Sequence, residues 1–141
     1  MKSCDELTVE SGAGAFTALA YPAAASRLGV TLILGHGAGA GQRSPFMVTF
    51  AQALAAFGVD VLTFDFPYMQ QRRRAPDRQP VLEACYARVI GRAREAIPSA
   101  REHLFIGGKS MGGRIATHVA AADRMLPLDG LVLLGYPLHP P

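Results

Sequence analysis

Apolar runs that alternate with stretches of helical periodicity constrain the fold of this chain more than any other feature. Residues 30–34 are all β-branched or aliphatic, which is typical of a strand buried on both faces of a parallel sheet. Further strands are expected in a hairpin, at 8–10 and 16–21, and at 59–64, 103–107 and 129–134. Helices are expected to begin at Pro45, at Pro80 and after Ser110, with a long polar loop over 65–79. This alternation predicts an α/β three-layer sandwich with a mostly parallel sheet.

The length and composition fit one domain of this kind, spanning residues 1–141. Half of the residues are hydrophobic and 18% are charged, so the chain can bury a proper core. The glycines and prolines separate the apolar runs, as turns do, and there is no internal repeat or interdomain linker.

The net charge of +3 raises the question of an anionic partner. Eight arginines lie between Arg72 and Arg101, against three acidic residues in that stretch. No helix-turn-helix, zinc-finger or aromatic RNA-binding pattern accompanies them, so we expect a solvated basic face and no nucleic-acid partner.

The two cysteines and the apolar runs bear on location. Cys4 and Cys85 do not form a disulfide framework, which favours a reducing, cytoplasmic compartment. Residues 1–6 are not followed by a hydrophobic run, so we expect no signal peptide. No apolar stretch approaches the length of a membrane-spanning helix, and we expect no membrane partner.

The most specific motif is Gly-Lys-Ser-Met-Gly at 108–112, which matches G-x-S-x-G between an expected strand and an expected helix. In such a turn the serine is lifted clear of the strand end, and the flanking positions must be nearly free of side chains. The motif predicts Ser110 as a nucleophile and the Met111 N–H as a donor to the developing oxyanion.

A second glycine-rich loop, at 35–41, follows the first buried strand. Its position predicts the other oxyanion donor, with the Ala38 N–H as first choice and Gly37 next. His36 is expected to order the loop rather than act as the base, because it precedes the serine in the chain.

The same loop also fits the loose G-x-G-x-x-G/A pattern of a Rossmann dinucleotide-binding domain, through Gly35, Gly37 and Ala40, with Asp65 after the next strand. Against this alternative, residues 42–45 delay the start of the helix that would meet the pyrophosphate, and the motif at Ser110 would be unexplained.

Other cofactor and metal sites are not indicated. A phosphate-binding P-loop would need a glycine where His103 stands. The four histidines are far apart in the sequence and do not combine with the cysteines, so neither a metal nor a cofactor is expected.

Several blocks together resemble one known family. They are LGHGAG at 34–39, SPFM at 44–47, FDFPY at 64–68, RR at 72–73, APD at 75–77, GGKSMGGR at 107–114 and GYPLHP at 135–140. In this order they are similar to the α/β-hydrolase family that includes testis-expressed protein thirty and small bacterial proteins like dienelactone hydrolases. The resemblance implies a cytoplasmic hydrolase of an ester-like acyl substrate, with Ser110 as nucleophile and residues 36–38 as the oxyanion loop.

The resemblance also implies a catalytic acid and histidine on later strands, and the sequence ends before such strands. Among the residues after Ser110, we expect His118 and Asp123 on a helix facing away from the cleft and Asp129 at the opposite sheet edge. His139 lies past a strand end and is the weak remaining candidate for a base.

We therefore expect a sheet of the α/β-hydrolase type that is incomplete at its C-terminal edge, in a truncated chain. Such a chain could be inactive, and a non-catalytic interaction module with the same fold is a further alternative. The open edge predicts a homo-oligomer.

Overall fold

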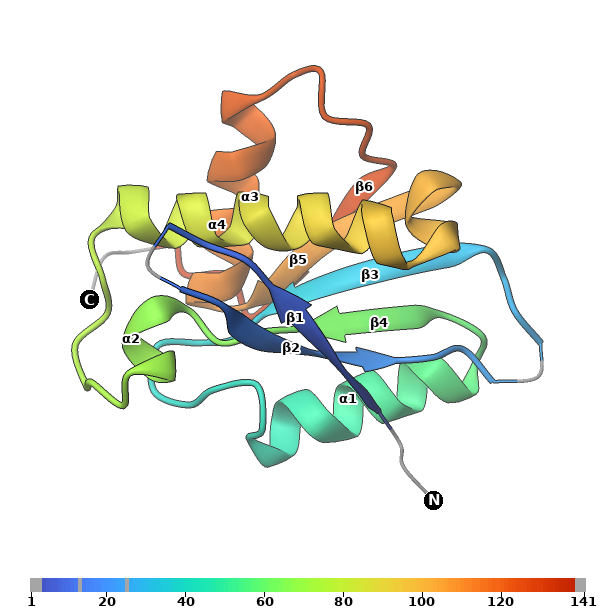
Figure 1. Ribbon diagram of the computed structural model, residues 1–141, viewed down its shortest axis with the longest axis horizontal. Helices are drawn as coiled ribbons and strands as arrows, with labels where there is room; N and C mark the ends of the chain where they lie inside the picture. Colours follow the sequence, from blue (N-terminus) through green and yellow to red (C-terminus); the bar gives the residue numbers. More distant parts are fainter. Residues whose placement is uncertain (1–3, 13, 25, 139–141) are drawn as a thin grey trace.

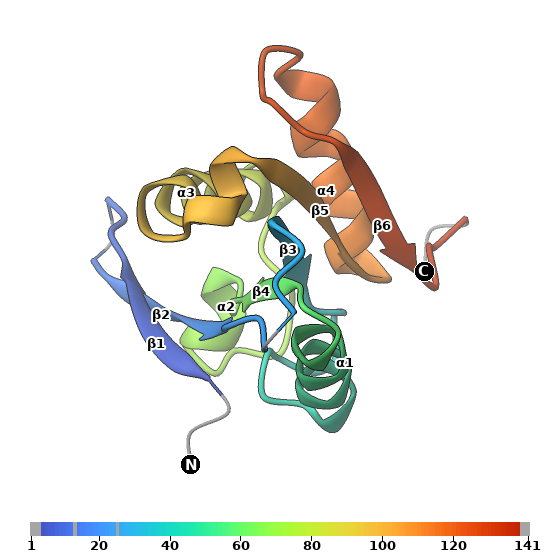
Figure 2. The same cartoon turned by 90° about the vertical axis from the view of Figure 1, so that its right-hand side faces the viewer.

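The computed structural model describes residues 4–12, 14–24 and 26–138. One six-stranded sheet runs through the molecule in the strand order β1-β2-β4-β3-β5-β6 (Figures 1 and 2). The elements in chain order are β1 (Asp5–Val9), β2 (Phe16–Tyr21), β3 (Val30–Gly35), α1 (Pro45–Ala56), β4 (Asp60–Thr63), α2 (Pro67–Gln70), α3 (Gln79–Ala96), a 3₁₀ turn (Pro98–Arg101), β5 (His103–Lys109), α4 (Met111–Ala122) and β6 (Gly130–Leu134).

Strands β4, β3, β5 and β6 pair in parallel, whereas β1 and β2 form an antiparallel hairpin whose second strand joins β4. The predicted α/β sandwich with a mostly parallel sheet is therefore confirmed. In Figure 2, β1 and β6 lie at opposite edges of the sheet, and the described chain leaves β6 paired on one side, with β5.

The alternating side chains of β3 show how the layers are built. Leu32 and Leu34 are buried against α1, together with Met47. Ile33 is buried on the other face, in the cluster that holds α3 and α4. Because successive strand residues point to opposite faces, the β-branched and aliphatic run at 30–34 needs helices on both sides. Figure 1 shows this arrangement, with α1 on one face and α3 on the other.

The predicted polar loop over 65–79 is partly wrong, because it contains the one-turn helix α2. Pro67 occupies its first turn, where the fixed φ of proline and its missing N–H are tolerated. Phe66, the N-cap of this helix, and Tyr68, within it, are fully buried. Four residues are too few to show a helical period in the sequence, so the pattern indicated only a loop.

The carboxyl ends of the parallel strands place the two glycine-rich loops together. β3 ends at Gly35 and β5 ends at Lys109, and these strands are paired in parallel register up to Gly35 and Gly108. Loop 36–44 and Ser110 therefore both lie at the carboxyl ends of the parallel strands, where ligands bind in open α/β sheets.

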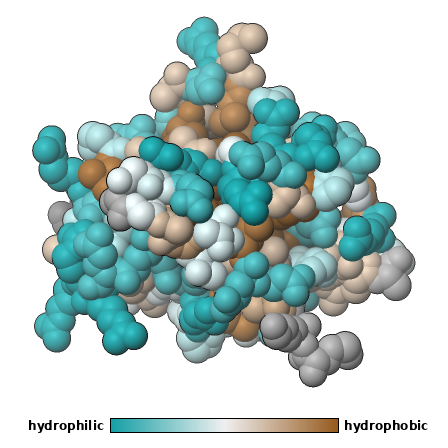
Figure 3. Space-filling view, in the orientation of Figure 1, coloured by the Kyte–Doolittle hydropathy of each residue, from teal (hydrophilic) through white to brown (hydrophobic). Residues whose placement is uncertain are grey.

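The surface is mostly hydrophilic on the side that carries β1 and α3, with apolar residues gathered toward the end of α4 (Figure 3). A hollow of about 390 Å³ lies there between α3 and α4, with Ile90 and Leu126 in its wall.

Across the described part of the chain, no helix combines the length and the apolar character needed to cross a membrane.

Candidate active site

Ser110 lies in a strained turn between β5 and α4, with φ of 51° and ψ of −111°. Among the residues that the structure describes, Arg72 is the one other non-glycine residue with positive φ. Such a backbone costs free energy for a residue with a side chain and is concentrated at functional sites. The Ser110 N–H donates to the Leu134 carbonyl at 2.8 Å, which ties the turn to the end of β6.

The flanking glycines permit this turn because the backbones of β3 and α4 meet there. A methyl group on Gly108 would overlap the carbonyl oxygen of Gly35, and one on Gly112 would overlap the same oxygen. No flexible side chain stands there to move aside. The spacing of the G-x-S-x-G motif thus has a direct steric reason in this molecule.

His36 holds the peptide that carries the Ala38 N–H. Its imidazole is fully buried, and its Nδ1 lies 2.7 Å from the Gly37 carbonyl while its Nε2 accepts the Phe66 N–H at 3.0 Å. A carbonyl only accepts, so Nδ1 carries the proton and the ring is neutral. Because a trans peptide is planar, fixing the Gly37 carbonyl turns the Ala38 N–H to the opposite side.

The electrostatics agree with this neutral role. Burial lowers the pKa of His36 below its ordinary value of 6.5, although the hydrogen bond to Gly37 and the nearby Asp65 act in the other direction. A buried neutral ring with both nitrogens engaged by backbone orders the loop, as predicted, and is not free to take a proton from Ser110.

Tyr68 fixes the next peptide of the loop. Its hydroxyl donates to the Ala38 carbonyl at 2.8 Å, and its own N–H is held by the Asp77 carboxylate at 2.8 Å. Burial, with Asp77 and Asp65 nearby, raises the pKa of Tyr68 to about 12, so the hydroxyl remains a donor at neutral pH. Sequence reasoning missed this residue; the aromatic FDFPY run at 64–68 was the signal that could have indicated it.

One cavity of about 700 Å³ has Ser110, Met111 and Ala38 in its wall. Gly37 lies close to Ser110, because a Cβ atom added at Gly37 would stand 3.9 Å from the Ser110 Cβ. The structure thus brings together all four residues that the sequence singled out, and the size of the cavity suits a small organic ligand.

The prediction for His118 is wrong, because its side chain lines the same cavity as Ser110. Residues 110, 114 and 118 recur every four positions, so they form one stripe along α4, and this stripe faces the cavity rather than the sheet. His118 is still no partner for the serine. The rise of an α-helix places it about 12 Å along the axis from Ser110, and its Nδ1 lies 2.6 Å from the Gln79 side-chain amide.

The acids after Ser110 lie elsewhere. Asp129 accepts the Leu104 N–H at 2.8 Å, at the start of β5 and thus at the opposite end of the strands. Asp123 follows α4 and accepts the Met125 N–H at 3.0 Å. His139 lies outside the described residues. Within the described ranges, no side chain hydrogen-bonds the Ser110 hydroxyl, so the base remains unassigned.

The arginines at 72–74 are exposed and do not line the cavity. Arg73 donates to Asp77 at 2.7 Å, and this pair fixes the loop that enters α3. Cys85 is buried, and burial raises its pKa to about 12, so its thiol stays protonated and unreactive at neutral pH.

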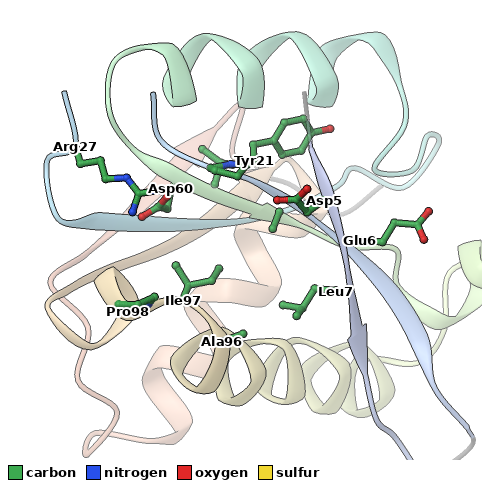
Figure 4. Close-up of a pocket in the computed structure, with 12 residues that line it drawn as sticks. Asp5, Glu6, Leu7, Tyr21, Arg27, Asp60, Ala96, Ile97 and Pro98 are labelled. Carbon is green, nitrogen blue, oxygen red and sulfur yellow. The ribbon is translucent and has the colours of Figure 1, made fainter. Parts of the chain in front are cut away.

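A further cavity, of about 260 Å³, lies at the other end of the sheet (Figure 4). Arg27 points toward Asp60 across it, and Tyr21 and Pro98 stand in its wall. Asp60 begins β4, and its carboxylate is engaged by the Ala23 N–H at 2.8 Å and the Ser99 hydroxyl at 2.7 Å. This cavity sits at the amino ends of the parallel strands, remote from the strained serine.

Comparison with known proteins agrees with the fold. The family described as "Alpha/beta hydrolase domain" matches residues 29–141, which is most of the chain. The chain belongs to this family. The α/β-hydrolase assignment also agrees with the predicted resemblance, including the dienelactone-hydrolase-like proteins among the solved structures below.

Solved structures share this α/β-hydrolase fold. An α/β serine hydrolase without lid from Xanthomonas campestris is 20% identical, with a TM-score of 0.80 over 97% of this chain and 63% of that protein. A serine hydrolase homologue from Coxiella burnetii is 16% identical, with a TM-score of 0.80 over 98% and 65%. Dienelactone hydrolase from Anabaena variabilis is 20% identical, with a TM-score of 0.67 over 94% and 63%. The chain thus spans less than two thirds of the length of each.

The Rossmann alternative is not favoured for this α/β-hydrolase chain. α1 begins at Pro45, well after the glycines, so its N-terminus cannot meet a pyrophosphate bound by that loop. Asp65, which would hold a ribose, instead accepts the Gln42 N–H at 2.7 Å.

Proposed function

We propose that this chain carries the nucleophile and the oxyanion hole of a serine hydrolase that transfers an acyl group from an ester-like substrate to water. The single observation that carries the proposal is the strained turn at Ser110, which opens into the cavity beside Ala38 and Met111. A simple strand-to-helix turn would not require a positive φ at a serine.

The donors support the same chemistry. Met111 is the first residue of α4, where N–H groups lack partners within the helix. The Ala38 N–H is turned away from the carbonyl that His36 holds. Two such amides beside the serine stabilise the negative charge that develops on the carbonyl oxygen when the Ser110 Oγ attacks the carbonyl carbon. The alcohol then leaves with a proton, and water releases the acid from the acyl-serine.

Activation of the hydroxyl is the part that the described residues do not supply. A serine hydroxyl is a weak nucleophile until a base takes its proton. Loss of a triad member removes most of the rate, although oxyanion stabilisation and binding still leave about a thousandfold over water. We therefore propose that the 141-residue chain alone is a poor esterase.

The test compares p-nitrophenyl acetate hydrolysis by the parent chain, Ser110→Ala and His139→Ala. We expect slow turnover that Ser110→Ala reduces to the buffer rate and His139→Ala leaves unchanged. Turnover that does not depend on Ser110 would contradict the proposal and favour the non-catalytic module. An ordinary enzymatic rate that His139→Ala abolishes would show that residues 1–141 contain their own base.

A cytoplasmic location is part of the proposal. It is supported by Cys4 and Cys85, which are both free thiols in the described chain. The proposed chemistry uses the serine and backbone amides and calls for no cofactor. Fractionation of cells that express the tagged chain tests the location: we expect the tag in the cytosolic fraction, and finding it in the periplasm or medium would contradict the proposal.

A further inference from the structure

Arg114 contributes a positive charge to the cavity that holds Ser110. It lies one turn after the serine, and its N–H bonds to the Ser110 carbonyl at 3.1 Å. Its side chain is half-buried and lines the cavity, and among the described residues its guanidinium has no hydrogen-bond or ion-pair partner. Because no described side chain or carbonyl occupies its N–H donors, the guanidinium is available to an anionic group that enters the cavity.

The acidic groups in or near the cavity wall do not form an ion pair with this guanidinium. Asp77 has its carboxylate engaged by the Tyr68 N–H and by Arg73. Glu83 lies beyond His118, with 3.9 Å between its carboxylate and the imidazole Nδ1. The described lining residues therefore offer one permanent positive charge without a counter-ion, which is Arg114.

We propose that Arg114 binds a carboxylate of the substrate, so that the site takes acyl groups that carry a negative charge. This inference rests on the proposed function, since it assigns the substrate class of the same site. A guanidinium and a carboxylate form two parallel charge-assisted hydrogen bonds, which give geometric specificity as well as affinity.

The spacing along α4 limits the length of such a substrate. One helical turn separates the Arg114 and Ser110 backbones by about 6 Å, and helical side chains lean toward the N-terminus. The Arg114 side chain therefore leaves the helix in the direction of the serine, and both residues line the same cavity. A carboxylate held by the guanidinium lies a few carbon atoms from the carbonyl that Ser110 attacks, as in the half-ester of a short dicarboxylic acid.

The test measures binding independently of turnover. Monomethyl succinate, which is anionic, and dimethyl succinate, which is neutral, are titrated into the 141-residue chain while the amide signals of Met111 and Gly112 are followed by NMR. The same titrations use Arg114→Gln, Arg114→Lys and a control, Arg74→Gln, which removes an exposed arginine outside the cavity. Unchanged amide dispersion establishes that each variant is folded.

We expect the parent chain and Arg74→Gln to bind the anionic half-ester more tightly than the neutral diester. Arg114→Gln should weaken binding of the half-ester by about tenfold or more and leave binding of the diester unchanged, because a hydrogen bond to a charged group is lost. Arg114→Lys should bind the half-ester with an affinity between those of the parent and Arg114→Gln, since lysine keeps the positive charge but lacks the two parallel N–H donors of the guanidinium. Equal half-ester binding by the parent and Arg114→Gln, or no preference of the parent for the half-ester, would overturn the inference.

The outcome is separate from that of the proposed function. If hydrolysis of p-nitrophenyl acetate depends on Ser110 but Arg114→Gln does not change binding, the proposed substrate class is refuted and the proposed hydrolase function is retained. If binding depends on Arg114 but hydrolysis does not depend on Ser110, the proposed hydrolase function is refuted and the anion site is retained.

Discussion

At the scale of single residues, His36 links the stability of the fold to the order of the proposed oxyanion loop. Its ring is buried, neutral and engaged at both nitrogens. Burial is the largest influence on it and lowers its pKa below 6.5 in the folded state. The unfolded chain therefore binds a proton at His36 at a pH where the folded chain does not.

This difference gives a pH dependence with a definite sign. The contribution of His36 to stability is complete above about pH 6.5, the ordinary pKa, and is lost as the pH falls below it toward the lowered value. We expect the free energy of unfolding to fall more steeply between pH 7 and pH 5 in the parent chain than in His36→Gln. Urea unfolding at each pH measures this free energy. A parental slope in His36→Gln would refute the assignment.

The site residues could be predicted from the sequence only where a motif fixes them through the backbone. Ser110 and Met111 follow from G-x-S-x-G, and Ala38 from its place after a buried strand, because both patterns describe loops at strand ends. Arg114 and His118 could not be placed in this way. They lie on α4, and the direction in which a helix stripe faces depends on how the helix packs, which one sequence does not state.

At the scale of elements, the close contact between β3 and the start of α4 governs whether the turn at Ser110 can form. Gly112→Ala puts a methyl group against the Gly35 backbone, and we expect it to destabilise the protein by about 2 kcal/mol or more. Gly91 is a matched control. It lies exposed in α3 with nothing near its missing side chain, so Gly91→Ala should stabilise by about 0.5–1 kcal/mol.

Chemical unfolding of the two alanine variants measures both effects. Equal changes in the unfolding midpoint for Gly112→Ala and Gly91→Ala would show that β3 and α4 are not in the close backbone contact that the structure gives them. A stabilised Gly91→Ala beside a destabilised Gly112→Ala is the expected pair.

Element prediction succeeded where periodicity is long and failed where it is short. The strand at β3 and the helices α1 and α3 were placed within a residue or two, because buried runs and proline starts mark them. The helix α2 and the 3₁₀ turn at Pro98–Arg101 were missed, since each spans four residues and is fixed by tertiary packing around Tyr68 or Ala100.

At the scale of the whole molecule, β6 is an edge strand with apolar side chains. Leu131 is 42% exposed and Leu133 is 40% exposed, and β6 pairs only with β5 among the described strands. An apolar strand with unpaired backbone groups favours pairing with another copy. We expect the 141-residue chain to self-associate at micromolar concentration, as measured by light scattering.

Charged substitutions at this edge test that expectation. Leu131→Lys combined with Leu133→Lys should shift the chain toward the monomer, because charges on an edge strand oppose pairing. Phe57→Lys, at a 75% exposed site after α1, should leave association unchanged. A monomeric parent chain, or equal effects of both changes, would exclude β6 as the contact.

The central claim, that Ser110 is a nucleophile held beside an oxyanion hole, is tested most directly by covalent labelling. A fluorophosphonate reacts when a serine oxygen attacks its phosphorus and fluoride leaves, so the modified peptide identifies the nucleophile by mass spectrometry. Because the described residues supply no base, we expect slow labelling that gives a phosphonylated peptide at Ser110, absent in Ser110→Ala and formed still more slowly in His36→Gln, where the Ala38 amide is no longer held. Labelling spread over exposed serines, or an unmodified Ser110 in the folded chain after prolonged treatment, would contradict it.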